Sequence, residues 1–68
     1  MQHEQEFIQI LKEIEESTEK QILVITEIKN KLIVYQHFDD AFKVRSIEKK
    51  LIELLDSARV QLTLPHKD

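Results

Sequence analysis

His37, Asp39 and Asp40 are the side chains with the most obvious chemical potential in this sequence of 68 residues. One imidazole and two carboxylates in a short loop can hold a metal ion in principle. Such a loop is more often a turn in which an aspartate caps the next helix, and either aspartate could do so. The other histidines, His3 and His66, are too distant along the chain for a structural zinc site. We therefore expect no metal ion and no cofactor.

A basic cluster follows this loop and consists of Lys43, Arg45, Lys49 and Lys50. These cations could contact the phosphates of a nucleic acid or a small anion. However, they fall on different faces of a helix, Glu48 and Glu53 dilute them, and the whole chain has a net charge of −3. Nucleic-acid-binding proteins usually present a concentrated basic face. We therefore expect a solvated surface here and disfavour nucleic-acid binding.

An acidic run in the first part of the chain consists of Glu13, Glu15, Glu16 and Glu19. It could imitate a nucleic-acid phosphate track or bind a basic partner. Glu15 and Glu19 are four residues apart, and like charges at this spacing destabilise a helix. The tolerated repulsion is a weak indication of a cationic partner, although a solvated helix face is the preferred interpretation.

Catalytic patterns are missing from the sequence. The chain has no cysteine and no glycine, which excludes a thiol nucleophile, a disulfide and a glycine-rich phosphate loop. Three serines have no histidine near them in the fold expected below, namely Ser17, Ser46 and Ser57. A small helical protein also lacks the concave pocket that catalysis needs. We predict that the protein is not an enzyme.

Apolar residues in the first half recur at intervals of three and four, which predicts a long helix over residues 3–37. This stripe consists of Phe7, Leu11, Ile14, Thr18, Ile25, Ile28, Leu32 and Tyr35. The alternative is an α-β-β-α fold with a β-hairpin over residues 21–38, which are rich in Ile and Val. A two-residue hairpin turn normally recruits glycine, and the candidate turn at Lys29 and Asn30 has none. We therefore favour the helix.

A second apolar stripe, offset from the first, predicts another helix over residues 40–63. It consists of Val44, Ile47, Leu51, Leu54 and Ala58. Pro65 disfavours helix at the residue before it. Two helices joined by a short connection pack antiparallel, so the predicted fold class is an all-α antiparallel helical hairpin.

A break in the long helix is a further alternative. Thr18 and Gln21 match a capping box, so a kink near Ser17 would let residues 3–16 fold back as a third helix. No residues are left for a connecting loop in that arrangement, and we therefore favour an unbroken helix.

Three aromatic residues lie around the expected turn, namely Tyr35, Phe38 and Phe42. At helical spacing, aromatic residues in such a place usually close the end of a hydrophobic core. We expect them to be buried there, with a hydrogen-bond partner for the hydroxyl of Tyr35.

The two predicted helices differ in length, and the shorter one would reach back only to about Ser17. Five residues would then be uncovered: Phe7, Ile8, Ile10, Leu11 and Ile14. An exposed apolar patch of this kind usually marks an interface. Residues 1–19 carry six acids and one base, whereas residues 20–68 carry nine bases and seven acids. These opposite charges favour an antiparallel homodimer, a four-helix bundle, or a higher assembly.

Length and composition complete the prediction. We expect one domain over residues 1–64 and a disordered tail over residues 65–68. A chain this short needs added stabilisation, and without cysteine the remaining source is oligomerisation. No apolar segment is long enough to span a membrane, so we expect a cytoplasmic protein of a bacterium, phage or plasmid. The predicted function is a non-enzymatic interaction module, a regulator, adaptor or inhibitor with an unidentified protein partner. Nucleic-acid binding and sequestration of a small anion are the alternatives.

Overall fold

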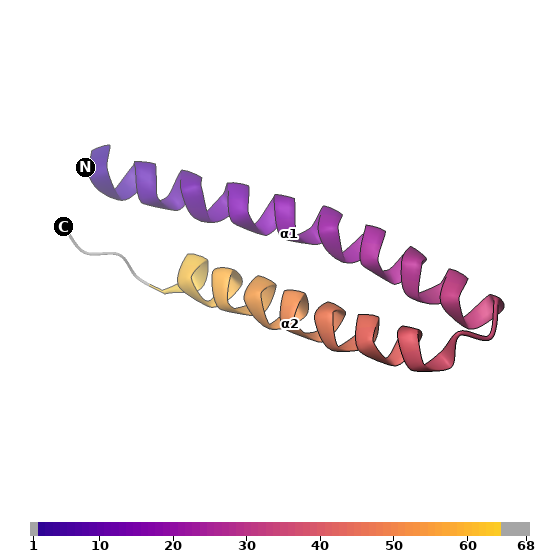
Figure 1. Cartoon of the computed structure of the whole chain (residues 1–68). Helices are drawn as coiled ribbons and strands as arrows, with labels where there is room; N and C mark the ends of the chain where they lie inside the picture. The colour runs from indigo at the N-terminus through magenta and orange to yellow at the C-terminus, as the bar shows by residue number, and fades with distance from the viewer. Residues whose placement is uncertain (1, 65–68) are drawn as a thin grey trace.

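Two α-helices form the whole architecture of the computed structural model, which describes residues 2–64: α1 (Gln2–Val34) and α2 (Phe38–Thr63). They pack side by side in antiparallel orientation and are joined by a short turn (Figure 1). The molecule is 52 Å long and only 14 × 12 Å across. The predicted helical hairpin is confirmed. The α-β-β-α alternative is wrong, because residues 21–34 belong to α1 and no strand occurs within residues 2–64.

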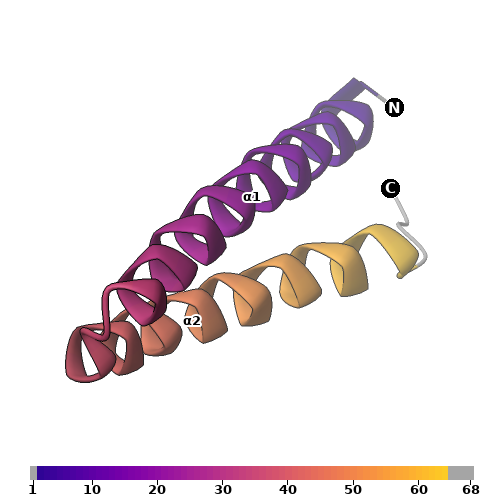
Figure 2. The ribbon, with the colours of Figure 1, turned by 90° about the vertical axis from the view of Figure 1, so that its right-hand side faces the viewer.

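Helix α1 continues without interruption through Ser17 and Thr18, and Figure 2 shows it as one rod. The alternative of a third helix over residues 3–16 is therefore wrong. Thr18 is turned toward α2 and exposes only 4 % of its surface. The capping-box pattern has no capping role here, because Thr18 lies inside a helix whose backbone is already hydrogen-bonded.

The turn between the helices begins earlier than the sequence predicts, because α1 ends at Val34 and not at residue 37. The amide of His37 donates to the carbonyl of Leu32 at 2.8 Å, and the amide of Gln36 donates to that of Ile33 at 3.0 Å. This pair of bonds is a Schellman motif, which requires one residue in the left-handed region. Gln36 occupies that position with a φ of 65°, because the chain has no glycine to take it.

Helix α2 begins at Phe38, two residues before the predicted start. The amide of Ala41 donates to the backbone carbonyl of His37, and the side chain of His37 makes no capping hydrogen bond. Asp39 and Asp40 lie in the first turn and do not precede the helix, so the predicted cap is wrong. Their carboxylates instead interact with the positive end of the helix dipole.

The helices meet along a seam of buried and half-buried side chains at alternating intervals of three and four, as in a coiled coil. In α1 the apolar seam residues are Ile8, Leu11, Ile22, Ile25 and Leu32, and in α2 they are Ala41, Val44, Leu51, Leu55, Ala58 and Leu62. Ala58 is buried as the second stripe predicts, whereas Ile47 and Leu54 are each 50 % exposed. The stripes predicted from the sequence therefore contain residues of two kinds, those in the seam and those on a neighbouring exposed face. The apolar surface of each helix is wider than the one partner helix can cover.

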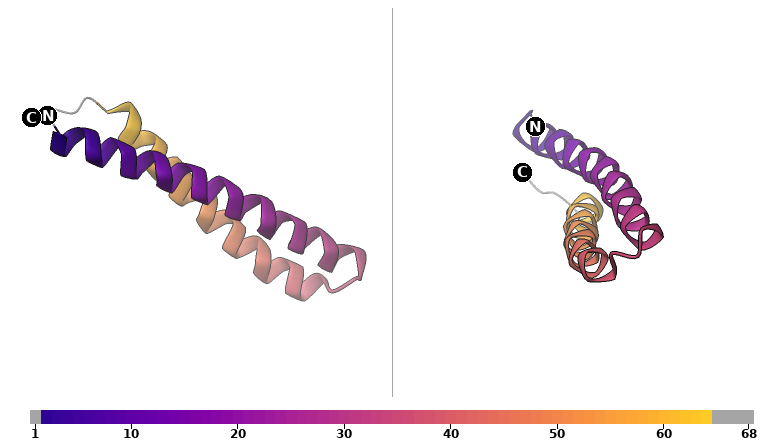
Figure 3. Two further views of the ribbon diagram at one scale, coloured as in Figure 1. Left: turned by 90° about the horizontal axis from the view of Figure 1, so that it is seen from above. Right: turned by 45° about the vertical axis from the view of Figure 1, so that its right-hand side comes forward.

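Helix α2 covers more of α1 than the sequence suggests, and it runs beside most of its length (Figure 3). Leu11 is buried at 6 % exposure, so α2 reaches well beyond Ser17. The predicted reach is wrong because the turn lies nearer the N-terminus and α2 has 26 residues. Of the five residues expected to be uncovered, Leu11 is buried and Ile8 is half-buried. The other three are exposed: Phe7, Ile10 and Ile14.

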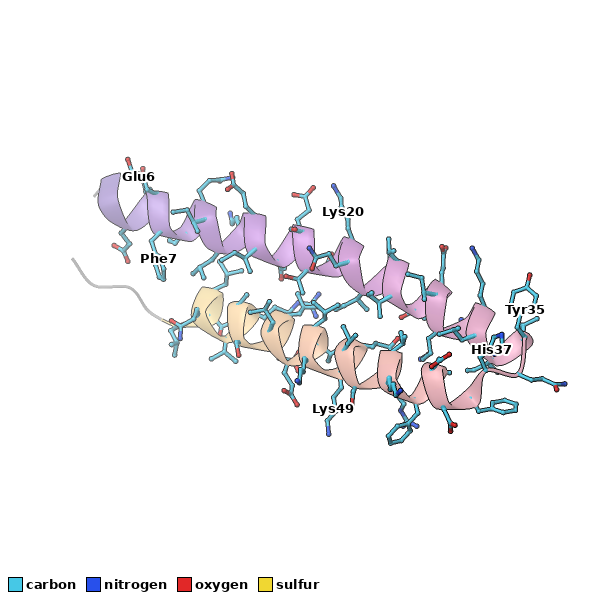
Figure 4. The ribbon with its side chains drawn as sticks, viewed as in Figure 1. Glu6, Phe7, Lys20, Tyr35, His37 and Lys49 are labelled. Carbon is cyan, nitrogen blue, oxygen red and sulfur yellow. The ribbon has the colours of Figure 1, made fainter. Side chains whose placement is uncertain are left out.

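The three aromatic residues at the turn do not close the core. Tyr35 is 71 %, Phe38 62 % and Phe42 71 % exposed, and Tyr35 points away from the hairpin (Figure 4). A two-helix hairpin has no third layer against which an aromatic ring at its tip could be buried, so this prediction is wrong.

Candidate interaction surface

One side of the hairpin carries a line of mostly apolar side chains next to the seam, which we call the apolar face. Its members are each 36–56 % exposed and consist of Phe7, Ile10, Ile14, Val24 and Ile28 in α1 with Ile47 and Leu54 in α2. In α1 they follow intervals of three and four, one residue out of step with the seam. This second periodic line predicts a second partner element, because a helix that is apolar over two adjacent stripes packs against two neighbours.

Two shallow grooves run along this apolar face between the helices. One has a volume of about 380 Å³, and Val24 and Ile25 of α1 line it together with Ile47 and Leu51 of α2. The other, of about 340 Å³, brings Ile10 and Ile14 together with Leu54. Gln21 lines both grooves, so they are neighbours on the same side of the molecule.

Polar side chains interrupt the α1 part of the apolar face at its middle. Ser17 and Gln21 lie there, between the apolar residues Ile14 and Val24, and both are exposed. Thr18 lies beside them but is turned into the seam. The apolar face is therefore divided into two apolar halves by one polar layer.

The opposite side of the hairpin carries ion pairs between the helices, and we call it the paired face. Arg59 donates from Nε to Glu15 at 3.0 Å and from Nη2 to Glu19 at 2.5 Å. The two carboxylates raise the pKa of Arg59 above its ordinary value, with the larger effect from Glu15. The repulsion between Glu15 and Glu19 is thus offset inside the chain by Arg59, so it needs no basic partner molecule to explain it.

A second polar group connects the helices nearer the turn. Lys29 donates to one carboxylate oxygen of Glu48 at 2.8 Å, and the hydroxyl of Thr26 donates to the other oxygen. The side chains of Lys29 and Glu48 are only 21 % and 12 % exposed. These hydrogen bonds hold the pKa of Glu48 below the ordinary range of a glutamate, and the bond from Lys29 has the larger effect.

Together these ion pairs fix how the helices lie against each other. Sliding α2 by one helical turn would separate Arg59 from Glu15 and Lys29 from Glu48 by about 5 Å. Exposed leucine and isoleucine side chains also occur on the paired face, at Leu23 and Ile52. Among the described residues, the ion pairs that join the two helices involve Lys29, Glu48, Arg59, Glu15 and Glu19, and none of these residues belongs to the apolar face.

The exposed area of the hairpin is large for its mass. The chain exposes 5662 Å², whereas a compact monomer of 8.1 kDa exposes about 4,500 Å². The excess is about 1,200 Å². A standard protein–protein interface buries about 800 Å² on each partner, so the hairpin has enough surplus surface for one.

The basic cluster is divided between two places on α2. Arg45 and Lys49 line a shallow groove of about 370 Å³ together with Phe42 and Ser46. Lys43 and Lys50 are exposed, but neither lines this groove. The structure therefore brings two of the four predicted anion contacts together and leaves the other two apart.

The remaining candidates form no chemical site. Within residues 2–64 no three His, Asp or Glu side chains converge in a way that could hold a metal ion, His37, Asp39 and Asp40 included. Glu16 makes a 3.5 Å pair with Lys20 of the next turn, in which both side chains are more than 70 % exposed. Such exposed pairs add little to stability.

Comparison with protein-family models, with curated protein sequences and with solved structures finds no match for this chain. In the part of the chain that the structure describes, neither helix combines the length and hydrophobicity needed to cross a membrane.

The two predicted stripes place three residues of the apolar face in the core of the hairpin: Ile28, Ile47 and Leu54. One feature of the sequence could have separated the apolar face from the core. Helix α1 contains two parallel lines of apolar residues, one through Ile14 and Ile28 and one through Leu11 and Ile25. Only one of these lines can face α2, which leaves the other for a different partner.

Proposed function

We propose that this protein is a non-enzymatic interaction module that self-associates through its apolar face and binds another macromolecule through its outer surfaces. In this proposal two hairpins form a four-helix bundle that acts in the cytoplasm as a regulator, adaptor or inhibitor. The apolar face is the observation that carries the proposal, because the ion pairs of the opposite side already have their partners within the chain.

The energy available from this face supports the proposal. Full burial of a large apolar side chain contributes about 1.5–3 kcal/mol, and the seven members of the face still expose between a third and just over half of their surface. Covering them would add about 5–10 kcal/mol for each copy. Two copies would gain about 10–20 kcal/mol, which is enough to offset an association cost of about 4–15 kcal/mol.

Two adjacent residues in α1 provide a matched test. Val24 lies on the apolar face at 56 % exposure, and Leu23 lies on the paired face at 68 %. We expect Val24→Lys to dissociate the dimer, because the new ammonium group would lose its hydration in the interface. Leu23→Lys should leave the dimer intact. Both variants should stay helical by circular dichroism.

Molar mass from light scattering measures the result. Dissociation by Val24→Lys alone supports the proposed interface. Dissociation by Leu23→Lys alone would move the interface to the paired face. A wild-type monomer at every protein concentration would refute self-association and leave the apolar face for a helix of another protein.

A second candidate function is binding of a phosphorylated ligand or a single-stranded nucleic acid at the groove of Arg45 and Lys49. The observation that favours it is the exposed ring of Phe42 beside both cations, a combination that binds a base and its phosphate. Retention on a phosphate resin that falls steeply with salt would support it. The charge change in Arg45→Gln/Lys49→Gln should abolish retention, whereas Lys43→Gln/Lys50→Gln should preserve it.

A further inference from the structure

We propose that the two copies pack with α1 against α1 of the second copy, in antiparallel orientation, about a two-fold axis that crosses α1 midway between Ser17 and Gln21. This inference depends on the proposed self-association and adds its geometry. It places the turns of the two hairpins at opposite ends of the bundle.

The order of residues along the apolar face of α1 carries this inference. The positions of this line in α1 are 7, 10, 14, 17, 21, 24, 28 and 31. Their intervals of 3, 4, 3, 4, 3, 4 and 3 read the same in both directions along the helix. When α1 is laid antiparallel on its own copy about the proposed axis, like residues meet in the central layers, whereas Phe7 faces Lys31 in the outermost layer at each end. Ile10 faces Ile28, Ile14 faces Val24, and Ser17 faces Gln21. An antiparallel coiled coil has alternating layers of this kind.

Other registers match polar residues with apolar ones. Sliding one copy by a heptad in one direction would place Ile14 against Ser17 and Ile10 against Gln21. Sliding it in the other direction would place Ser17 against Ile28. Of these three registers, only the proposed one puts Ser17 and Gln21 together, where the amide of Gln21 and the hydroxyl of Ser17 can donate to and accept from each other. A single polar layer of this kind specifies register and orientation in helical bundles.

A bundle with both turns at one end fits less well. In that arrangement α1 would pack on α2 of the second copy. The ion pair between Lys29 and Glu48 shows that these two residues lie at about the same height along the long axis of the hairpin, which fixes the residues of α1 and α2 that would meet. Val24 would meet Leu54, but two other layers would be mixed, because Ile28 would meet Lys50 and Lys31 would meet Ile47. The apolar residues of α2 on this face are also too few to form the interface alone, since only Ile47 and Leu54 belong to it.

The charge of the hairpin favours the same orientation. Its open half, residues 2–20 and 51–64, has eight acids and three bases, a net charge of −5. Its turn half, residues 21–50, has four acids and six bases, a net charge of +2. Antiparallel copies place each open half beside a turn half, whereas parallel copies place the two acidic halves together.

Spin labels on single cysteines test the orientation, since the chain has no cysteine of its own. Lys20 and Asn30 are both exposed positions in α1. In the proposed dimer two labels at position 20 lie about 3 Å apart along the bundle axis, and two at position 30 lie about 33 Å apart. The label distance between copies, measured by pulsed electron resonance, should therefore be short for Lys20→Cys and long for Asn30→Cys.

The outcomes separate this inference from the proposed function. A long distance at both positions or a short one at both, in variants that light scattering shows to be dimers, would overturn the antiparallel register and leave self-association in place. A monomeric mass for the unlabelled protein would overturn both proposals.

Lys20 supplies an independent test, because in this register it flanks the axis and faces its own copy. Lys20→Gln should tighten the dimer by about twofold, since it removes a pair of like charges. Lys12→Gln is the matched control: it changes the net charge equally, but Lys12 lies on the side of α1 away from the apolar face. A dimer that Lys20→Gln weakens, or that both variants tighten equally, would contradict the register.

Discussion

Leu54 and Leu55 are neighbours in α2 with opposite roles, so replacing each with alanine distinguishes the seam from the apolar face. Leu55 is 7 % exposed and Leu54 is 50 % exposed. Truncation of a buried leucine to alanine typically lowers the free energy of unfolding by about 2–5 kcal/mol. In a hairpin of only two helices the neighbours of Leu55 can relax into the space. We therefore expect a loss near the lower limit, about 2–3 kcal/mol.

Leu54 should behave differently because half of its surface is already in water. Removing its side chain should lower the free energy of unfolding of the hairpin by about 1 kcal/mol. In the dimer the same side chain is covered, so Leu54→Ala should also raise the dissociation constant about fivefold to tenfold. The alanine has the same helix propensity at either position, so the comparison isolates burial.

Urea unfolding followed by circular dichroism, over a series of protein concentrations, measures both effects. The free energy extrapolated to low concentration should fall more for Leu55→Ala than for Leu54→Ala. Sedimentation equilibrium should show the larger loss of affinity for Leu54→Ala. If Leu54→Ala lost more folding stability than Leu55→Ala, Leu55 would not be the seam residue. The result would instead support the sequence prediction, which places Leu54 in the core.

Three further changes have defined outcomes. Gln36→Gly should raise the free energy of unfolding by about 0.5–1 kcal/mol. Glycine adopts the left-handed conformation without the steric cost that a side chain adds, but it loses more conformational entropy on folding, which offsets part of the gain. An unchanged thermal midpoint would contradict backbone strain at Gln36. The lowered pKa of Glu48 means that its hydrogen bonds stabilise the fold above about pH 4.3 and are lost as the pH falls through the lower folded-state pKa. Glu48→Gln should therefore lose less stability than wild type on acidification, measured by urea unfolding at several pH values, and an equal loss would contradict this role of Glu48. Arg59→Gln should lower the thermal midpoint at low salt and much less at high salt, and an equal loss at both would argue against an ionic contribution.

The sequence predicts the helical hairpin because its strongest signals are local. Intervals of three and four, the missing glycine and the late Pro65 all favour two helices with one reversal between them. Element boundaries are less well determined. Gln36 ends α1 in a left-handed conformation that usually belongs to glycine or asparagine, and nothing in its residue type indicates that the turn begins there.

The choice between the two apolar lines of α1 could not be made from α1 alone. Leu11 and Ile14 are both three or four residues from other apolar positions, and either line could face α2. The choice is made by contacts between residues far apart in the sequence. Glu15 and Glu19 meet Arg59, and Lys29 meets Glu48, which turns one side of α1 toward α2 and leaves the other exposed.

The acidic run illustrates the same limit in a functional prediction. Repulsion between Glu15 and Glu19 is a weak indication of a basic partner molecule, but sequence spacing cannot show that Arg59 of the same chain, 40 residues further along from Glu19, pairs with both carboxylates. The basic cluster was likewise treated as one group, whereas helical geometry divides Arg45 and Lys49 from Lys43 and Lys50.

Molar mass in solution, measured by light scattering over a range of protein concentrations, tests the central claim most directly. If a second copy covers the apolar face, the mass should approach about 16 kDa, twice the 8.1 kDa of one chain, and Val24→Lys should return it to that of one chain. A wild-type protein that stays at the mass of a single chain at high concentration, while circular dichroism shows it to be helical, would contradict the account.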